Sequence, residues 1–165
     1  MSNPYRELQK RLDLYSFGFP ETDSGLEIEL LKELFTEKDI AVFLAMSPRL
    51  ETPAEAAPRL GMSEAEAEAV LEDMAARGLL FRLRRDGRAR YGAIPFMHGL
   101  VEFHINKLDP KFAALLKSFY ERHYNRNISD NADLFLRVVP VNREVTFERH
   151  VASYEDAKSI LDNAG

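Results

Sequence analysis

The chain has 165 residues, of which 45% are hydrophobic and 30% charged, and its net charge is −5 at pH 7. This length allows a domain with its own core and an appendage, and the acidic balance argues against a general nucleic-acid binder, although a local basic patch could still act. The absence of cysteine excludes disulfides, thiol catalysis and cysteine-held metal clusters within this chain, and the absence of a long apolar run or a signal-like start predicts a cytoplasmic protein without a membrane contact.

The first third of the chain is predicted to be helical. Amphipathic helices are expected over residues 5–15, over residues 26–35, and from a cap at Thr36 onward, because leucines and aromatic residues recur there at helical spacing. Phe17 to Pro20 break the first helix, and the polar loop 21–25 can cap the second. Residues 47–51 are expected to form a connector or a short strand.

Two capped helices separated by a glycine turn follow. Thr52 caps a short helix with Glu55 three residues on, Pro58 is expected to interrupt that helix, and Gly61 ends it. Ser63 and Glu66 form the capping box of a longer helix that Gly78 stops. The buried stripe of this second helix is predicted to comprise Ala67, Val70, Leu71, Met74 and Gly78.

A β-hairpin is predicted directly after the second helix. Residues 79–83 and 88–91 alternate apolar and charged side chains, and Asp86-Gly87 turns between them. A helix, a glycine turn, a longer helix and a hairpin in this order predict a winged helix-turn-helix. The remainder of the chain gives helices over residues 97–105 and 110–123, strands over 134–141 and 144–149, and a last helix from Ser153 to about Leu161.

The expected fold is therefore mostly helical (α+β). It comprises a winged helix-turn-helix domain over residues 1–95, a helical extension over 96–125 that could serve as a dimer or packing element, and a small α+β tail over 126–165.

The register of the hairpin decides what its arginines face. A three-residue loop with Gly87 left-handed would pair Phe81 with Tyr91 and Leu83 with Ala89, and burial of that face should select it over a two-residue loop. Arg82 would then lie opposite Arg90, and Arg84 opposite Arg88, and like charges directly opposed cost stability. Two interpretations stay open: an acidic partner meets this face, or the arginines contact water and the protein's own glutamates.

DNA recognition by the second helix is disfavoured by charge. Its polar positions are mostly acidic, comprising Glu64, Glu66, Glu68, Glu72 and Asp73. Duplex DNA is densely negative, and non-specific affinity comes from neutralising its phosphates. A basic hairpin beside an acidic helix instead suits a protein partner with complementary patches. The alternative is a solvated helix face that only keeps the protein soluble.

Catalytic and metal-binding patterns are weak. The histidines are widely spread and comprise His98, His104, His123 and His150. His98 and Glu102 lie one helical turn apart, but no third ligand accompanies them, so ordinary core or surface histidines are expected. There is no glycine-rich phosphate loop and no nucleophile motif. No catalytic residue and no metal ligand is predicted.

The N-terminal blocks resemble a known family. The residues that carry the resemblance are Tyr5–Leu8, Phe19–Glu27, Leu30–Thr36, Glu51–Pro53, Gly78–Leu80 and, less specifically, Arg137–Val141. This pattern is similar to the start of 4Fe-4S ferredoxin-type electron-transport proteins of anaerobic bacteria and archaea. In that family a winged-helix region precedes a cysteine-rich domain that holds the clusters. The cluster cysteines would follow residue 165, so no cluster ligand is carried over, and [4Fe-4S] clusters are expected only in a downstream domain.

The sequence thus predicts a non-catalytic docking domain of an iron–sulfur electron-transport protein, which binds a redox or other protein partner. The predicted partner-binding residues are the hairpin arginines Arg82, Arg84, Arg85, Arg88 and Arg90. The rival is a transcriptional regulator that binds DNA and dimerises through helices at residues 97–124. An enzyme is the third interpretation.

Overall fold

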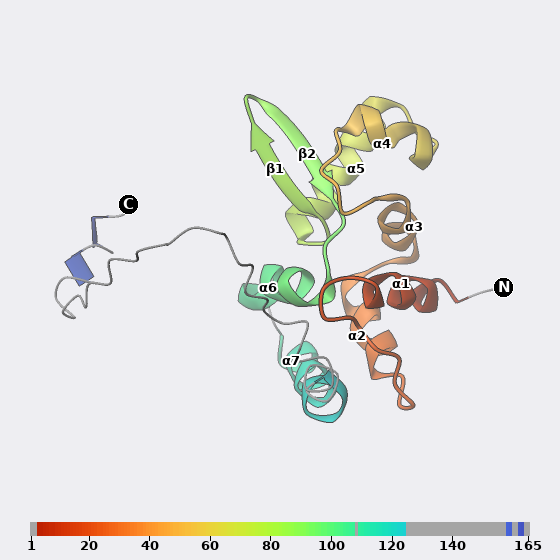
Figure 1. Ribbon diagram of the computed structural model, residues 1–165, viewed down its shortest axis with the longest axis vertical. Coiled ribbons are helices and arrows are strands. Elements are labelled where there is room, and N and C mark those ends of the chain that lie inside the picture. The colour runs from red at the N-terminus through yellow and green to blue at the C-terminus, as the bar shows by residue number, and fades with distance from the viewer. Residues whose placement is uncertain (1–2, 108, 125–157, 160–161, 164–165) are drawn as a thin grey trace, which may run out of the picture. The chain divides into compact units, whose positions relative to one another are not determined.

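The computed structural model describes residues 3–107, 109–124, 158–159 and 162–163. The chain divides into two compact units, Met1–Phe135 and Leu136–Gly165. The described part of the first unit is mostly helical with a two-stranded antiparallel sheet, which confirms the predicted class at that level (Figure 1). In the second unit the described residues are helical or turn, and Lys158 pairs with Asp162. The division at residues 95 and 125 stays a prediction.

The helices agree closely with the hydrophobic spacing. In chain order they are α1 (Pro4–Asp13), α2 (Leu26–Leu34), α3 (Glu37–Ala45), α4 (Pro53–Leu60), α5 (Glu64–Arg77), α6 (Val101–His104) and α7 (Pro110–Phe119). The strands are β1 (Phe81–Arg85) and β2 (Arg88–Gly92), and a backbone bridge joins Glu51 to Tyr91 in β2. The strands predicted over residues 134–141 and 144–149 lie outside the described residues, as does most of the last predicted helix.

Local capping signals fix the helix ends. Three reciprocal capping boxes form as predicted, at Thr36 with Asp39, Thr52 with Glu55, and Ser63 with Glu66. Gly61 and Gly78 end α4 and α5 in the left-handed conformation, with φ of 66° and 91°. The polar loop before α2 gives no side-chain cap, because Gly25 occupies the N-cap position.

The interruption expected at Pro58 is wrong. Proline removes the hydrogen bond that its own N–H would donate to the carbonyl one turn earlier, and its ring crowds that carbonyl. In the short α4 that carbonyl belongs to Ala54, which is exposed and can be hydrated, so the helix continues to Leu60.

The helix expected over residues 97–105 is also only partly correct. The chain forms a π turn η1 (Phe96–Leu100), then α6, then a 3₁₀ turn η2 (Ile105–Lys107). Met97 and His98 have non-helical backbone angles, and His98 is left-handed with φ 55°. This kink breaks the predicted apolar stripe, so Leu100 and Val101 are buried while Ile105 is exposed. A second π turn, η3 (Tyr120–Tyr124), follows α7.

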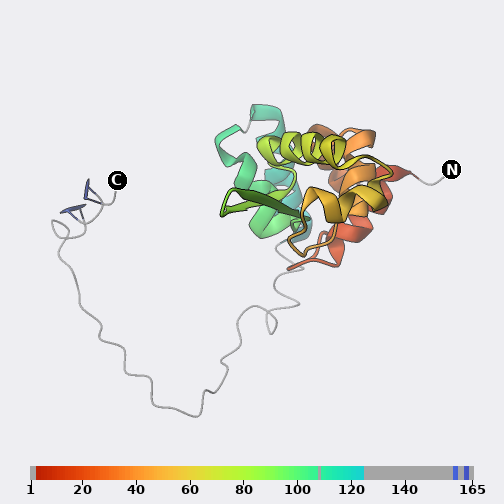
Figure 2. The same cartoon turned by 90° about the horizontal axis from the view of Figure 1, so that it is seen from above.

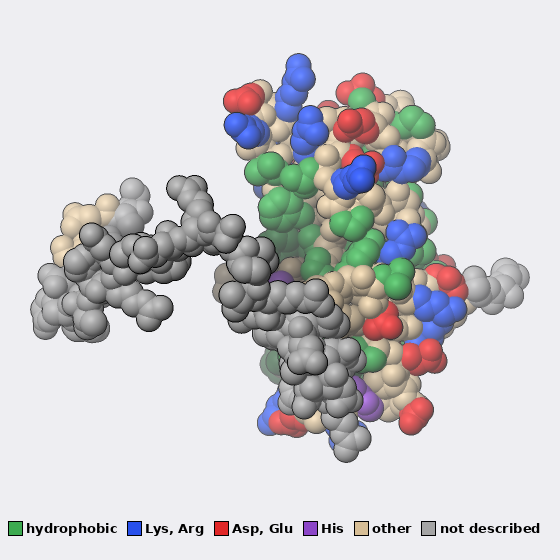
Figure 3. Space-filling model, viewed as in Figure 1, with side chains coloured by type: hydrophobic (Ala, Val, Ile, Leu, Met, Phe, Trp, Pro, Cys, Tyr) green, Lys and Arg blue, Asp and Glu red, His purple; other side chains and the backbone are tan. Residues whose placement is uncertain are grey.

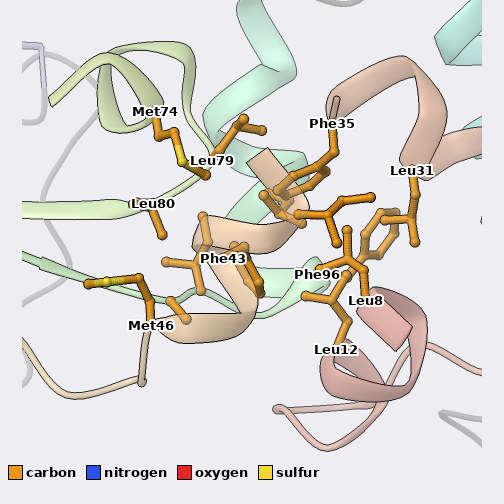
Figure 4. Close-up of a cluster of buried hydrophobic side chains, with 14 of the residues drawn as sticks. Leu8, Leu12, Leu31, Phe35, Phe43, Met46, Met74, Leu79, Leu80 and Phe96 are labelled. Atoms are coloured by element: carbon orange, nitrogen blue, oxygen red, sulfur yellow. The ribbon is translucent and has the colours of Figure 1, made fainter. Parts of the chain in front are cut away.

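The core joins all the major elements of the first unit. Figure 4 shows Leu8 and Leu12 of α1, Leu31 of α2, Phe43 of α3 and Phe96 converging with their neighbours. The fully buried aromatic residues are Phe19, Phe35, Phe43, Tyr91, Phe96, Phe119 and Tyr124. Such side chains dominate the energetics of cores, and deleting one typically costs about 3–5 kcal/mol.

A polar network holds the N-terminal segments together. Glu27 is completely buried and contacts the guanidinium of Arg6 at 3.0 Å. The hydroxyl of Thr22 donates to the same carboxylate, and Gln9 donates to the carbonyl of Phe19 at 2.6 Å. Buried charges need such partners to offset the loss of hydration. Thr22 and Glu27 belong to the block that carries the family resemblance, and here their contacts are structural.

The hairpin register differs from the prediction. Asp86 and Gly87 form a two-residue loop, both with positive φ (52° and 74°), and the strands pair Leu83 with Arg90 and Arg84 with Ala89. Positive φ at both positions is the type I′ geometry that Asp-Gly favours. Every residue of β1 is exposed, so burial does not select the register. The predicted arginine pairs, Arg82 opposite Arg90 and Arg84 opposite Arg88, are therefore wrong.

Candidate interaction surface

The inner face of the hairpin is tied to α5 by one carboxylate. Arg82 and Arg84 both contact Oε1 of Glu72, Arg84 at 2.9 Å, and the hydroxyl of Tyr91 donates to Oε2 at 2.7 Å. Figure 2 shows α5 lying alongside the hairpin. The expectation that the arginines contact the protein's own glutamates is therefore confirmed for two of the five. These two side chains are committed to the fold.

Both ends of the tyrosine–carboxylate contact have shifted pKa values. The hydrogen bond from Tyr91 is the main cause that holds the pKa of Glu72 below its ordinary value, and Arg82 and Arg84 add to it. Burial, and then the contact with Glu72, raise the pKa of Tyr91 to about 12. The carboxylate and the neutral phenol are thus the stable forms at neutral pH.

The outer face of the hairpin combines apolar and cationic side chains. Because paired residues share a face, the observed register puts Phe81, Leu83 and Arg85 of β1 on the same side as Arg88 and Arg90 of β2. Phe81 is 39% exposed and Leu83 40%, although both are large apolar residues. Figure 3 shows hydrophobic side chains gathered below the arginine-bearing tip of the hairpin.

An aromatic residue of α6 extends this face. The ring of Phe103 is 42% exposed and lies nearly parallel to that of Phe81, with 6.3 Å between the ring centres. The backbone of Gly78 brings α6 close, because a Cβ there would meet Phe103 and His104 at 3.1 Å. Lys107 also donates to the carbonyl of Ala76. We call the set Phe81, Leu83, Arg85, Arg88, Arg90 and Phe103 the hairpin surface.

The cations of the hairpin surface have few partners among the described residues. Arg85 contacts Asp86 at 3.8 Å with both side chains almost fully exposed, so this pair is weak. Arg90 reaches the carbonyl of Leu50 at 3.5 Å and helps to lower the pKa of Glu55. Arg88 lines a hollow together with Glu64 and Glu68, but within the described ranges it forms no ion pair. These three arginines remain available to an anionic partner, whereas Arg82 and Arg84 share the single negative charge of Glu72.

The exposed face of α5 stays acidic. Glu64, Glu66 and Glu68 are exposed. The basic residue of α5, Arg77, binds Asp39 through both terminal nitrogens and also contacts Asp73. Burial alone would raise the pKa of Asp39, but the hydrogen bonds from Arg77 and Thr36 outweigh it and lower that pKa. The exposed face of α5 is therefore negatively charged, whereas the hairpin surface is positively charged.

His98 and His104 have ordinary surroundings, whereas His123 packs against Phe119 with its Nε2 buried and without a hydrogen-bond partner among the described residues. The ring of His98 meets Phe17 edge-on, and Nδ1 of His104 lies 2.7 Å from the carbonyl of Leu100. Glu102, the suggested companion of His98, accepts a hydrogen bond from the N–H of Gly99 at 2.6 Å. Among the described residues no three acidic or histidine side chains gather where they could hold a metal ion. His150 lies outside the described residues.

A separate hollow of about 800 Å³ lies between α3, α4 and α5. Its apolar lining comprises Ala41, Val42, Ala45, Leu60, Met62, Ala69 and Val70. Two arginines at its rim already have carboxylate partners, Arg59 with Glu51 and Arg77 with Asp39. Lys38 also lines the hollow and forms no ion pair within the described ranges, so the hollow has one unpaired cation where the hairpin surface has several.

Sequence reasoning named the arginines but missed the apolar half of this surface. The expected register places Phe81 and Leu83 on a covered face, and Phe103 falls within the extension 96–125 that is expected to serve as a dimer or packing element. The Asp-Gly pair was the available signal, because its preference for a two-residue loop moves Leu83 to the side of Arg90.

Comparison with known proteins adds no assignment: no protein-family model matches the chain, and no curated protein is similar to it. In the described part of the chain no helix has both the length and the apolar character needed to cross a membrane.

Proposed function

We propose that this chain is a non-catalytic docking domain, which binds an acidic protein partner through the hairpin surface. The observation that carries the proposal is the division of the five arginines between the two faces of the hairpin. Glu72 pairs with both Arg82 and Arg84, while Arg85, Arg88 and Arg90 stand beside exposed Phe81 and Leu83. Apolar side chains rimmed by unpaired cations suit an interface in which burial gives affinity and charge gives specificity.

We infer further that α3, α4, α5 and the hairpin together form a winged helix-turn-helix. Three features support this inference: Gly61 separates α4 from α5, the hairpin follows α5 directly, and Glu51 bridges to β2 like a third strand of the wing. The exposed carboxylates of α5 have the wrong sign for the major groove of DNA. The arrangement therefore favours a protein over an operator as the partner.

The electron-transport part of the proposal depends on the family resemblance of the N-terminal blocks. The chain contains no cysteine, so its residues do not fit an iron–sulfur cluster, and we assign it no electron-transfer step. In this proposal the chain positions a redox partner near clusters held elsewhere. Dimerisation through residues 97–124 stays a prediction.

Site-specific photo-cross-linking tests the proposal. A benzoyl-phenylalanine at position 83 of the full chain should capture a protein in the source organism, and the same group at exposed position 29 in α2 should not. The captured protein, once purified, should carry a redox cofactor and bind the chain directly. Capture from both positions alike, or a purified protein without a redox cofactor, would refute the proposal.

Charge reversal supplies the matched variant. Arg88→Glu together with Arg90→Glu should weaken the purified pair at least about tenfold, because placing like charges against each other across an interface costs several kcal/mol and 1.4 kcal/mol is tenfold. The Arg88 change also removes a like-charge contact with Arg85 directly opposite, so the hairpin should not unfold. If the chain instead shifts duplex DNA at sub-micromolar concentration with strong salt dependence, it is a DNA-binding regulator and the docking proposal is wrong.

A further inference from the structure

The outer edge of β1 is a free strand edge. The described part of the sheet consists of β1 and β2, and Glu51 extends it on the side of β2. In a hairpin closed by a two-residue loop, the pair that flanks the loop exchanges both hydrogen bonds, and the next pair exchanges none. The backbone groups of Arg82 and Arg84 therefore point away from β2. The contact of Tyr91 with Glu51 agrees with this alternation. Tyr91 lies opposite Arg82, and its backbone N–H and carbonyl form hydrogen bonds of 2.8 and 2.9 Å with Glu51, on the side of β2 away from β1.

The side chains that usually protect such an edge are held elsewhere. Natural sheets discourage pairing at an edge by extending charged side chains from it. Here the side chains of Arg82 and Arg84 fold onto Glu72 on the inner face. The free backbone groups of β1 thus remain accessible beside two arginines whose side chains are drawn to Glu72.

We propose that β1 binds its partner by strand addition, and that the partner supplies an extended segment with alternating apolar residues and an acidic end. This inference rests on the proposed function and states the chemistry of the docking partner. Residues of the incoming strand that share the outer face would lie opposite Phe81, Leu83 and Arg85 in turn. Two apolar residues at two-residue spacing match Phe81 and Leu83, and a carboxylate two residues further matches Arg85.

The neighbouring residues strengthen the same preference. Arg88 and Arg90 lie on the same face one strand further in, so a carboxylate near the hairpin tip meets several cations. Phe103, stacked on Phe81, adds apolar area at the other end of β1. The charge gradient along the strand therefore also selects the direction of the incoming segment.

A second copy of this chain is a poor occupant of the edge. The outward-facing residues of β1 are Arg82 and Arg84, so any antiparallel pairing of two such edges puts an arginine directly opposite an arginine. It would also bring together the unpaired arginines of two hairpin surfaces. The charge complementarity thus favours an acidic segment from a different protein.

The test uses the full chain and short fluorescein-labelled peptides in which valine alternates with threonine. One peptide carries aspartates at its N-terminal end, a second carries them at its C-terminal end, and lysines replace them in the control. One aspartate peptide should bind in fluorescence anisotropy, and the lysine peptide should bind at least about tenfold more weakly. N-methylation of the peptide amides that face β1 should also cost at least about tenfold, because it blocks the backbone hydrogen bonds without changing the side chains.

A pair of protein variants isolates the backbone contribution. Arg84→Ala and Arg84→Pro both remove the contact with Glu72, but only proline removes the outward N–H, and proline is tolerated at such edge positions. The proline variant should bind the aspartate peptide at least about tenfold more weakly than the alanine variant. Equal binding by N-methylated and unmodified peptides would overturn strand addition.

The outcomes separate this inference from the proposed function. If charge reversal at Arg88 and Arg90 weakens the purified partner but Arg84→Pro binds it as well as Arg84→Ala, docking stands and strand addition fails. If neither change affects the partner, both fail. A dimer in analytical ultracentrifugation that Arg84→Pro converts to a monomer would identify a second copy as the occupant and overturn the inference.

Discussion

The hydroxyl of Tyr91 donates a hydrogen bond of 2.7 Å to Glu72, and this contact joins β2 to the middle of α5. The same carboxylate takes Arg82 and Arg84 of β1, so one side chain of the helix holds both strands. The tyrosine side chain is almost fully buried, whereas the arginines are partly or largely exposed. Because exposed ion pairs contribute little, we expect the tyrosine to provide most of the stabilisation.

Tyr91→Phe should lower the free energy of unfolding by about 1.5–3 kcal/mol, the range for a hydrogen bond to a charged acceptor. Tyr5→Phe is the matched control, because Tyr5 donates to the neutral carbonyl of Phe35 at 3.0 Å and should lose only about 1 kcal/mol. Urea denaturation measures both. A Tyr91→Phe loss no larger than that of the control would mean that Glu72 does not anchor the hairpin.

The same contact predicts how hairpin stability depends on pH. The folded pKa of Glu72 lies below the ordinary 4.5, so its stabilisation is present above about pH 4.5 and is lost as the pH falls through the folded value. The folded pKa of Tyr91 is raised from 10 to about 12, so its stabilisation is present below pH 10 and is lost as the pH rises through about 12.

The free energy of unfolding should therefore be measured across this pH range for wild type and for a Glu72→Gln, Tyr91→Phe double variant. The difference between the two should form a plateau at intermediate pH. The difference should shrink at both acid and alkaline ends. Glu55 serves as a reference, because its pKa is lowered mainly by its capping contact with Thr52. The difference in the free energy of unfolding between wild type and Glu55→Gln should shrink only at acid pH. A difference that stays constant down to pH 3 would contradict the assignment to Glu72.

The sequence predicted the parts of the fold that depend on neighbouring residues. Capping boxes, helix-ending glycines and apolar spacing act within a few positions, so α1 to α5 and all three capping boxes could be located in advance. The kink at Met97 and His98 carries no such signal, because nothing in the local spacing distinguishes a π turn from a regular helix.

The candidate surface was predicted only in part, for a different reason. The three-residue loop was expected because one face of the hairpin would be covered. Since β1 is exposed along its whole length, the turn residues Asp86 and Gly87 decide how the strands pair. The contacts of Arg82 and Arg84 with Glu72, and of Phe81 with Phe103, join residues far apart in the sequence. Such contacts depend on how elements pack, which the spacing of apolar residues does not specify.

Gly78 should be much less tolerant of alanine than Gly61, although both end a helix with positive φ. Gly61→Ala should cost about 1 kcal/mol for the left-handed backbone, because no atom lies within 4 Å of the added Cβ. Gly78→Ala adds a clash with Phe103 and His104 at 3.1 Å, which should bring the total to about 2–4 kcal/mol. Thermal unfolding of the two variants tests this, and equal losses would show that α6 does not pack tightly against Gly78.

Engineered cysteines can test the hairpin register directly, because the chain has none of its own. Arg84 and Ala89 face each other at a position without mutual hydrogen bonds, where Cα atoms lie about 4.5 Å apart and a disulfide fits. Arg84→Cys with Ala89→Cys should therefore oxidise readily and close the hairpin.

In the alternative register with a three-residue loop, Leu83 would face Ala89, so Leu83→Cys with Ala89→Cys is the matched control. Its two side chains point to opposite faces in the observed register and should stay reduced under the same glutathione buffer. Faster oxidation of the control pair in a thiol-labelling assay would establish the three-residue loop instead, move Leu83 to the side of Ala89, and remove the apolar part of the hairpin surface.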